Sequence, residues 1–147
     1  MNIDVTSFEP AADHIRTVRN AVFGDEQGVA RDLDWDGADP RCTHVLAVDA
    51  CGRPVGTGRV QADGRIGRLA VLAPWRGRGV GSRMLAVLVQ AARERGVRTV
   101  YLHAQLPAVA FYERNGFERA GAEFTEAGIQ HVNITRATQS RTDRQPG

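Results

Sequence analysis

The chain has 147 residues, of which 42% are hydrophobic and 24% charged, a composition typical of one soluble globular domain with its own core. No apolar run approaches the ~20 residues of a membrane span. The N-terminus has no signal-peptide pattern, so we expect a cytoplasmic protein that does not contact membranes. The formal net charge of +2 is too small to indicate nucleic-acid binding by itself.

The nineteen basic residues are all arginine. Without lysine, this chain has no Schiff-base nucleophile and no phosphate-loop lysine. Cys42 and Cys51 lack the spacing of a zinc site or a redox motif. We therefore expect two reduced thiols and no metal site.

Strand and helix signals alternate along the chain, which predicts a mixed α/β sheet with helices packed on it in a single domain, residues 1–135. The segment 25–40 is predicted to be an acidic loop, and the polar tail 136–147 is expected to be disordered. The predicted strands cover residues 3–8, 43–49, 54–60, 66–72, 97–103, 117–124 and 129–135. The predicted helices run from Pro10 to Gly24, from the glycine-rich segment to Gly96, and from 108 to 115.

The segment Arg76-Gly77-Arg78-Gly79-Val80-Gly81-Ser82 lies between a predicted strand and a predicted helix. Such a turn directs backbone N–H groups at one point, and the helix dipole adds partial positive charge, which suits a phosphate or diphosphate. Flexible surface loops have a similar composition, so this segment alone is a weak signal. Two nucleotide motifs fail, because the dinucleotide fingerprint needs G-x-G-x-x-G and the P-loop needs a lysine.

The same segment resembles the signature of the GCN5-related N-acetyltransferases, a strand followed by [R/Q]-x-x-G-x-[G/A] and a helix. A second element of that family appears at 108–117 as A-V-A-F-Y-E-R-N-G-F. Finer features resemble the small ElaA-like branch, although Gln130 stands where the branch usually has proline. These features are Val22-Phe23, Glu26-Gln27, the Asp36-Gly37-Ala38-Asp39 loop, residues 102–105 and residues 126–131.

The resemblance spans residues 3–135 and implies a mostly antiparallel sheet of six to seven strands, splayed at the cofactor site and flanked by about four helices. It implies acetyl-coenzyme A as co-substrate and direct acetyl transfer to a primary amine. In the family, the backbone of the strand at Leu69, Ala70 and Val71 pairs with the pantetheine arm and supplies an N–H to the oxyanion. The resemblance further implies that the amides of residues 76–82 hold the diphosphate and that Phe111 lines the cofactor site.

The resemblance also assigns proton donation to the leaving thiolate to Tyr112, whose hydroxyl could instead be only a hydrogen-bond anchor. Glu26 and His131 are candidates for the general base, beside a water relay or a purely structural role for each. His103 and Gln105 are expected to line the acceptor site. Four acids in the loop, Asp32, Asp34, Asp36 and Asp39, either attract a cationic acceptor or are simply solvated.

The sequence is also compatible with two other classes of protein. The first is an acyl-coenzyme A-binding sensor or interaction domain without turnover. The second is a nucleic-acid module, suggested by Arg59, Arg65 and Arg68 beside the arginines of the glycine-rich segment; aromatic residues are too sparse there to stack bases. We expect these arginines to bind the phosphates of the cofactor. The identity of the amine acceptor is open, and a homodimer is the commonest assembly for a soluble protein.

Overall fold

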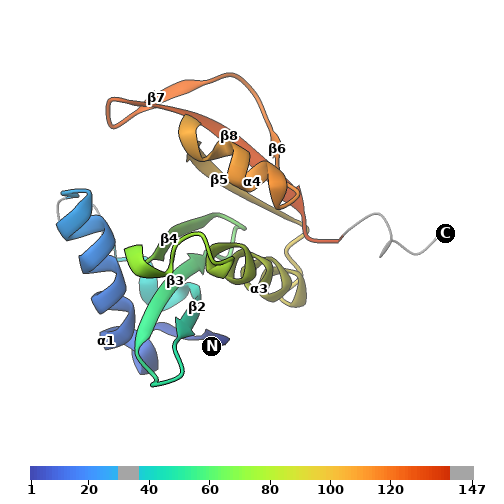
Figure 1. Ribbon diagram of the computed structural model, residues 1–147. Helices are drawn as coiled ribbons and strands as arrows, with labels where there is room; N and C mark the ends of the chain where they lie inside the picture. Colours follow the sequence, from blue (N-terminus) through green and yellow to red (C-terminus); the bar gives the residue numbers. More distant parts are fainter. Residues whose placement is uncertain (30–36, 140–147) are drawn as a thin grey trace.

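The computed structural model describes residues 1–29 and 37–139, which form two antiparallel sheets (Figure 1). The first sheet has the strand order β1-β2-β3-β4; the second has the order β5-β8-β6, and β7 also pairs with β8. The strands are β1 (Asn2–Thr6), β2 (Thr43–Val48), β3 (Pro54–Val60), β4 (Ile66–Val71), β5 (Thr99–Gln105), β6 (Glu118–Arg119), β7 (Phe124–Glu126) and β8 (Ile129–Ala137).

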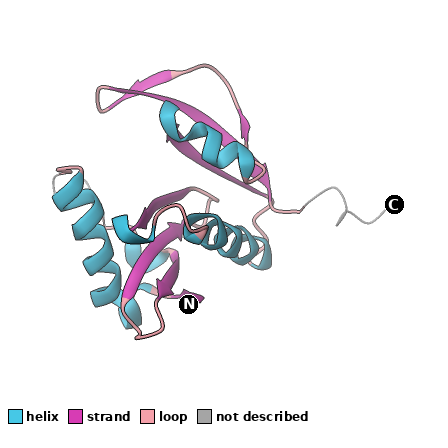
Figure 2. Cartoon of the chain, viewed as in Figure 1, coloured by secondary structure: helices cyan, strands magenta, loops and turns pink. Residues whose placement is uncertain are grey.

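Helices connect these strands and cover the sheets (Figure 2). The helix α1 (Phe8–Arg19) continues directly into a π-helical segment, η1 (Asn20–Glu26). Such π-helical segments are frequent at functional sites. The other α-helices are α3 (Val80–Glu94) and α4 (Val109–Arg114). Three short 3-10 segments are η2 (Asp39–Arg41), η3 (Ala73–Trp75) and η4 (Leu106–Ala108).

Helix α3 supplies the centre of the hydrophobic core. Its residues Met84, Leu85 and Leu88 are fully buried and belong to one cluster with residues of both sheets. Two glycines of β3 allow the helix to approach the sheet: a Cβ on Gly56 would lie 2.9 Å from Met84 Sδ, and one on Gly58 would lie 3.1 Å from Leu88 Cδ1. This close packing fixes the position of α3 on the first sheet.

Strand β4 is packed between two helices. Side chains alternate between the faces of a strand, so Leu69 and Val71 join the cluster around α3 while Ala70 packs on the opposite face. There Ala70 contacts Val18 of α1 and Val22 of η1. Helices on both faces therefore hold β4 in place.

The two sheets meet only at one end of β4 and β5. In the described part of the chain, a single parallel bridge joins Arg65 and Tyr101, where the Tyr101 N–H donates to the Gly64 carbonyl at 3.0 Å. Beyond it the strands diverge (Figure 1), so the outer edge of β4 has no strand partner among residues 1–29 and 37–139. The mixed α/β class and the splayed sheet predicted above are confirmed.

Some elements differ from the sequence prediction. The described residues hold eight strands and three α-helices, where six to seven strands and about four helices were expected. The first helix begins at Phe8 and becomes π-helical at Asn20. The predicted strand 117–124 is interrupted at Gly121, whose φ is +86°.

The last strand is longer than the sequence prediction. Strand β8 continues through Ala137, and the Thr138 N–H donates to the Arg98 carbonyl at 2.9 Å. Backbone hydrogen bonding of the last strand thus extends beyond residue 135, the predicted end of the domain. Residues 140–147 of the predicted tail lie outside the described residues.

Candidate functional site

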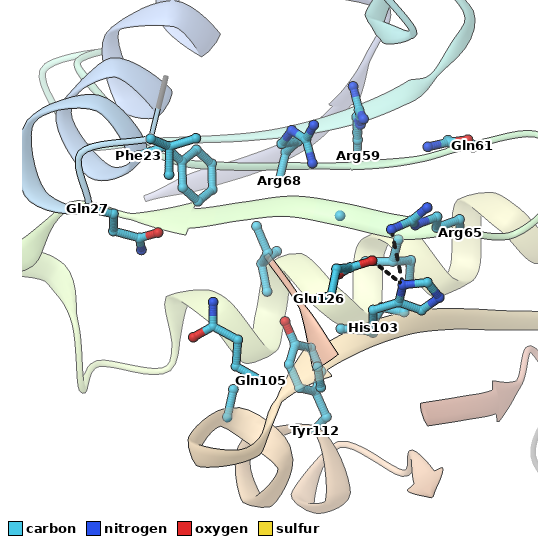
Figure 3. Close-up of a pocket in the computed structure, with 17 residues that line it drawn as sticks. Phe23, Gln27, Arg59, Gln61, Arg65, Arg68, His103, Gln105, Tyr112 and Glu126 are labelled. Atoms are coloured by element: carbon cyan, nitrogen blue, oxygen red, sulfur yellow. Dashed lines mark hydrogen bonds and ion pairs between the residues drawn. The ribbon is translucent and has the colours of Figure 1, made fainter. Parts of the chain in front are cut away.

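Two adjoining cavities lie along the unpaired edge of β4. The turn cavity, of about 700 Å³, is lined by β4, residues of the segment 76–82 and Phe111. The arginine cavity, of about 460 Å³, is lined by residues of β3, β4 and β5 and by Tyr112 (Figure 3). Gln27, Leu69 and Ala108 line both cavities. The two cavities therefore meet at Leu69 in β4.

A β-bulge lies in β4 beside this meeting point. Thr57 of β3 pairs with Ala70, whereas Arg59 pairs with Gly67, so the register shifts between these pairs. Within the bulge, Arg68 has a φ of 51°, a left-handed conformation that costs a non-glycine residue about 1–2 kcal/mol. Bulges redirect side chains and end regular pairing. Here the Arg68 side chain lines the arginine cavity.

The turn cavity ends at the N-terminus of α3. Gly77 and Gly79 have φ values of +75° and +81°, which glycine adopts without steric cost. Gly79 is the N-cap of α3, and no side chain caps the helix. The first N–H groups of a helix have no intrahelical acceptor, so the amides of residues 80–82, which line the cavity, suit an anion. At Gly81 a Cβ would lie 3.3 Å from the Phe111 ring.

The arginines of the turn already have contacts with other side chains. Arg76 Nη2 lies 3.0 and 2.8 Å from the two carboxylate oxygens of Glu26, and Arg76 Nε donates to the Val71 carbonyl at 2.9 Å. Arg78 places its guanidinium 5.1 Å from the Trp75 ring centroid. Glu26 lines the turn cavity and does not line the arginine cavity. This base candidate therefore lies beside the glycine-rich turn.

Tyr112 lies on α4, and its hydroxyl points into the arginine cavity (Figure 3). Its ring packs edge-on against Phe111 and Phe117, with centroid distances of 5.0 and 5.7 Å. Burial raises the pKa of Tyr112 to about 12, because the phenolate would lose its solvation. At neutral pH the hydroxyl keeps its proton and can donate a hydrogen bond into the cavity.

At one end of the arginine cavity, His103 lies between a carboxylate and a guanidinium. His103 Nδ1 is 3.1 Å from Glu126 Oε1 and 3.4 Å from Arg65 Nη2 (Figure 3). All three residues line the cavity. One nitrogen cannot donate to Glu126 and accept from Arg65 at the same time. The tautomer of the His103 ring therefore determines which contact forms, since Nδ1 donates to Glu126 only when it carries the hydrogen.

His131 is behind this cluster. It is 6% exposed, its Nδ1–H donates to the Ile129 carbonyl at 2.8 Å, and its ring stacks on Phe124 at 5.9 Å. His131 Nε2 lies 3.7 Å from Glu126 Oε2, and His131 lines neither cavity. Glu126, rather than His131, thus reaches the cavity from this side.

Of the four acids predicted in the acidic loop, the structure describes Asp39, and its environment differs from the prediction. Asp39 is buried, not solvated, and its Oδ1 accepts hydrogen bonds from Arg19 Nη1 at 2.7 Å and Arg59 Nη1 at 3.0 Å. His44 Nε2 lies 2.9 Å from the Asp39 carbonyl oxygen, and burial lowers the pKa of His44. The three acids within residues 32–36 lie outside the described residues.

The other predicted site residues can also be placed. His103 and Gln105, expected to contact the acceptor, line the arginine cavity, whereas Cys42 and Cys51, which are not joined in a disulfide, line neither cavity. In residues 1–29 and 37–139 no cluster of His, Cys, Asp and Glu is suited to hold a metal ion. None of the helices described there is long and apolar enough to span a membrane.

Sequence reasoning misplaced three arginines and missed one acid. Arg59, Arg65 and Arg68 were expected to bind the phosphates of the cofactor, but they line the arginine cavity and not the turn cavity. Glu126 was not selected as a site residue. It reaches His103 because β8 pairs with both β5 and β7. No local pattern in the sequence signals that contact.

Comparison with known proteins identifies the family to which this chain belongs. A model of the acetyltransferase (GNAT) domain matches residues 13–137. A Bacillus subtilis (strain 168) protein assigned as an acetyltransferase is 34% identical over 146 residues, covering 95% of this chain and 99% of that protein. The chain therefore belongs to the GCN5-related N-acetyltransferase family, as its motifs at 76–81 and 108–117 predicted.

Solved structures support the same architecture. A Lactobacillus plantarum protein assigned as an N-acetyltransferase superposes with a TM-score of 0.84 at 27% identity, covering 95% of this chain and 100% of that one. Escherichia coli ElaA superposes with a TM-score of 0.81 at 24% identity, covering 92% and 99% of the two chains. ElaA thus shares the fold.

Proposed function

We propose that this protein is an acetyl-coenzyme A-dependent N-acetyltransferase that transfers the acetyl group directly to a primary amine. One observation carries the proposal. The unpaired edge of β4 leads from the anion site at α3 to Leu69, where the turn cavity meets the arginine cavity. A linear molecule with a diphosphate at the helix and an extended arm along β4 would bring its thioester to that junction.

The residues present fit coenzyme A. The amides of the segment 76–82 suit the diphosphate, and Gly81, which lines the turn cavity, lets α3 approach the Phe111 ring closely. The backbone of Leu69–Val71 can pair with the pantetheine amides as an added strand would, and one of its N–H groups can donate to the oxyanion. Acetyl-coenzyme A supplies an acetyl group activated as a thioester.

Tyr112 is proposed to donate a hydrogen bond to the leaving thiolate. A thiol has an ordinary pKa of ~8.5, and that of Tyr112 is about 12. Complete proton transfer from the phenol to the thiolate is therefore unfavourable by about 5 kcal/mol. A hydrogen bond that stabilises the developing charge does not incur this cost.

His103, oriented by Glu126, is proposed to accept the proton of the incoming ammonium. The imidazole faces the arginine cavity and has a carboxylate at 3.1 Å, which is the arrangement of a general base with its orienting group. The earlier candidates are less well placed, since Glu26 pairs with Arg76 and His131 lies behind Glu126.

A panel of primary amines tests the function, with release of the coenzyme A thiol from acetyl-coenzyme A as the readout. Amine-dependent release is expected in the wild type, together with its loss in Gly81→Val. Ala86→Val is the matched control, because Ala86 is exposed on the same helix. Binding of acetyl-coenzyme A without thiol release across the panel would instead indicate a sensor or interaction domain.

A further inference from the structure

Resting on this proposed function, we infer that the acceptor is a small amine that also carries a carboxylate, which Arg65 and Arg68 bind in the arginine cavity. The described residues that line this cavity contribute three arginines and one glutamate. Within a cavity bounded by low-dielectric protein, the guanidinium of Arg65 attracts anions and repels polycations. The charge of the site thus distinguishes between classes of amine.

Arg65 is the strongest single argument. Its backbone is fixed by the bridge to Tyr101 and by an N–H donated to Asp63 Oδ1 at 3.0 Å. Its guanidinium lies 3.4 Å from His103 Nδ1, and among the described residues it forms no ion pair with a carboxylate. A half-buried guanidinium loses part of its hydration. A ligand carboxylate, which can accept two of its N–H groups, would offset that loss.

Arg68 provides the second positive charge. The bulge in β4 gives Arg68 its left-handed φ of 51°, and its side chain lines the cavity. Strained backbone of this kind persists mainly where the site depends on it. Arg59 is 2% exposed and donates to Asp39, so that carboxylate already compensates its charge and Arg59 is not assigned to the ligand.

The negative charge of Glu126 indicates where the amine end of the acceptor binds. Glu126 is the one carboxylate among the described lining residues, and it holds His103 at 3.1 Å. An ammonium group attracted by Glu126 lies beside the proposed base, while Arg65, which contacts the same His103 nitrogen as Glu126, receives the carboxylate. The cavity volume of about 460 Å³ lies in the range of small-molecule sites. The acceptor class is therefore an amino acid or a similarly small amino carboxylate.

Matched pairs of acceptors test the inference: phenylalanine with phenethylamine, lysine with cadaverine, and β-alanine with ethylamine. Thiol release should give a kcat/KM at least tenfold higher for the carboxylate member of at least one pair. Equal or higher values for the amines without carboxylate would overturn the inference and leave the N-acetyltransferase in place. A higher value for O-phosphoethanolamine than for every carboxylate would overturn the choice of carboxylate.

A binding measurement separates this inference from the proposed function. N-acetylphenylalanine, N-acetyl-lysine and N-acetyl-β-alanine are titrated calorimetrically into the protein with coenzyme A present. Binding of at least one of them that is weakened tenfold or more in Arg65→Gln supports the anion site even if no amine in the panel is acetylated. Absence of heat with all three, or equal affinity of the variant, contradicts it.

Variants that change the charge at residue 65 extend the kinetic test. Arg65→Gln should raise KM for the best carboxylate acceptor about 10- to 100-fold and raise KM for its decarboxylated partner far less, while Arg65→Lys restores part of the loss. Arg65→Glu should shift the preference toward cadaverine. Arg53→Gln is the control, because that side chain is 76% exposed on the β2–β3 hairpin and pairs with Asp49. Should Arg65→Gln not fold, Arg68→Gln gives the same comparison.

Discussion

Replacing Tyr112 by phenylalanine removes one hydroxyl from the arginine cavity and keeps the ring that packs on Phe111 and Phe117. Because the pKa of about 12 disfavours full proton transfer, the hydroxyl contributes a hydrogen bond to a developing anion, worth about 1.5–3 kcal/mol. That range corresponds to roughly 10- to 150-fold in rate. We expect kcat to fall about 100-fold, with little change in KM for either substrate.

The assay is thiol release at saturating acetyl-coenzyme A with the best amine of the panel. Tyr101→Phe is the matched control, since the Tyr101 hydroxyl donates to Asp63 Oδ2 at 2.7 Å and lines neither cavity. In the wild type, ionisation of Tyr112 should produce no loss of kcat below about pH 11. An unchanged kcat in a folded Tyr112→Phe would remove this residue from the chemistry, and a loss beyond about 10⁴-fold would show that the hydrogen-bond argument underestimates its role.

Three further predictions concern binding and stability. Gly81→Val should weaken coenzyme A binding at least tenfold by calorimetry, because its Cβ would already lie 3.3 Å from the Phe111 ring; undiminished affinity would place the ligand elsewhere. Asp39→Asn should lower the free energy of unfolding in urea by about 3–5 kcal/mol, since two buried guanidinium groups donate to this carboxylate; a loss below about 1 kcal/mol would contradict that account. Burial lowers the pKa of His44 from 6.5, so the unfolded chain takes up a proton there before the folded protein does, and stability falls as the pH drops below about 6.5. Between pH 7.5 and 5.5 this loss is at most about 1.4 kcal/mol, and a His44→Gln variant that kept the same dependence would exclude His44 as its source.

The turn and its helix were predictable from the sequence because they depend on local rules. Glycines at 77 and 79 are needed where φ is positive, and apolar residues at helical spacing mark α3. The family motifs lie in the same short segments. Strand positions were also largely predictable from the alternation of side chains, although the interruption at Gly121 and the π-helical turn at Asn20 were not.

The contacts of the site follow from strand register, which local patterns do not encode. Glu26 and Arg76 are 50 positions apart, and they pair because η1 and the turn meet at one end of β4. His103 and Glu126 meet only because β8 lies between their strands. Sequence spacing gives no hint of either contact.

By itself, the sequence determined the mixed α/β class, the family and the glycine-rich turn before α3, because periodicity, positive-φ glycines and helix N-termini act within a few residues. The tertiary structure alone decided which arginines serve which cavity. Arg68 and Arg76 are close in the chain, but a bulge directs one into the arginine cavity and an ion pair holds the other at the turn. That division depends on the pairing of β3 with β4 and on the packing of η1, which become fixed only when distant segments fold together.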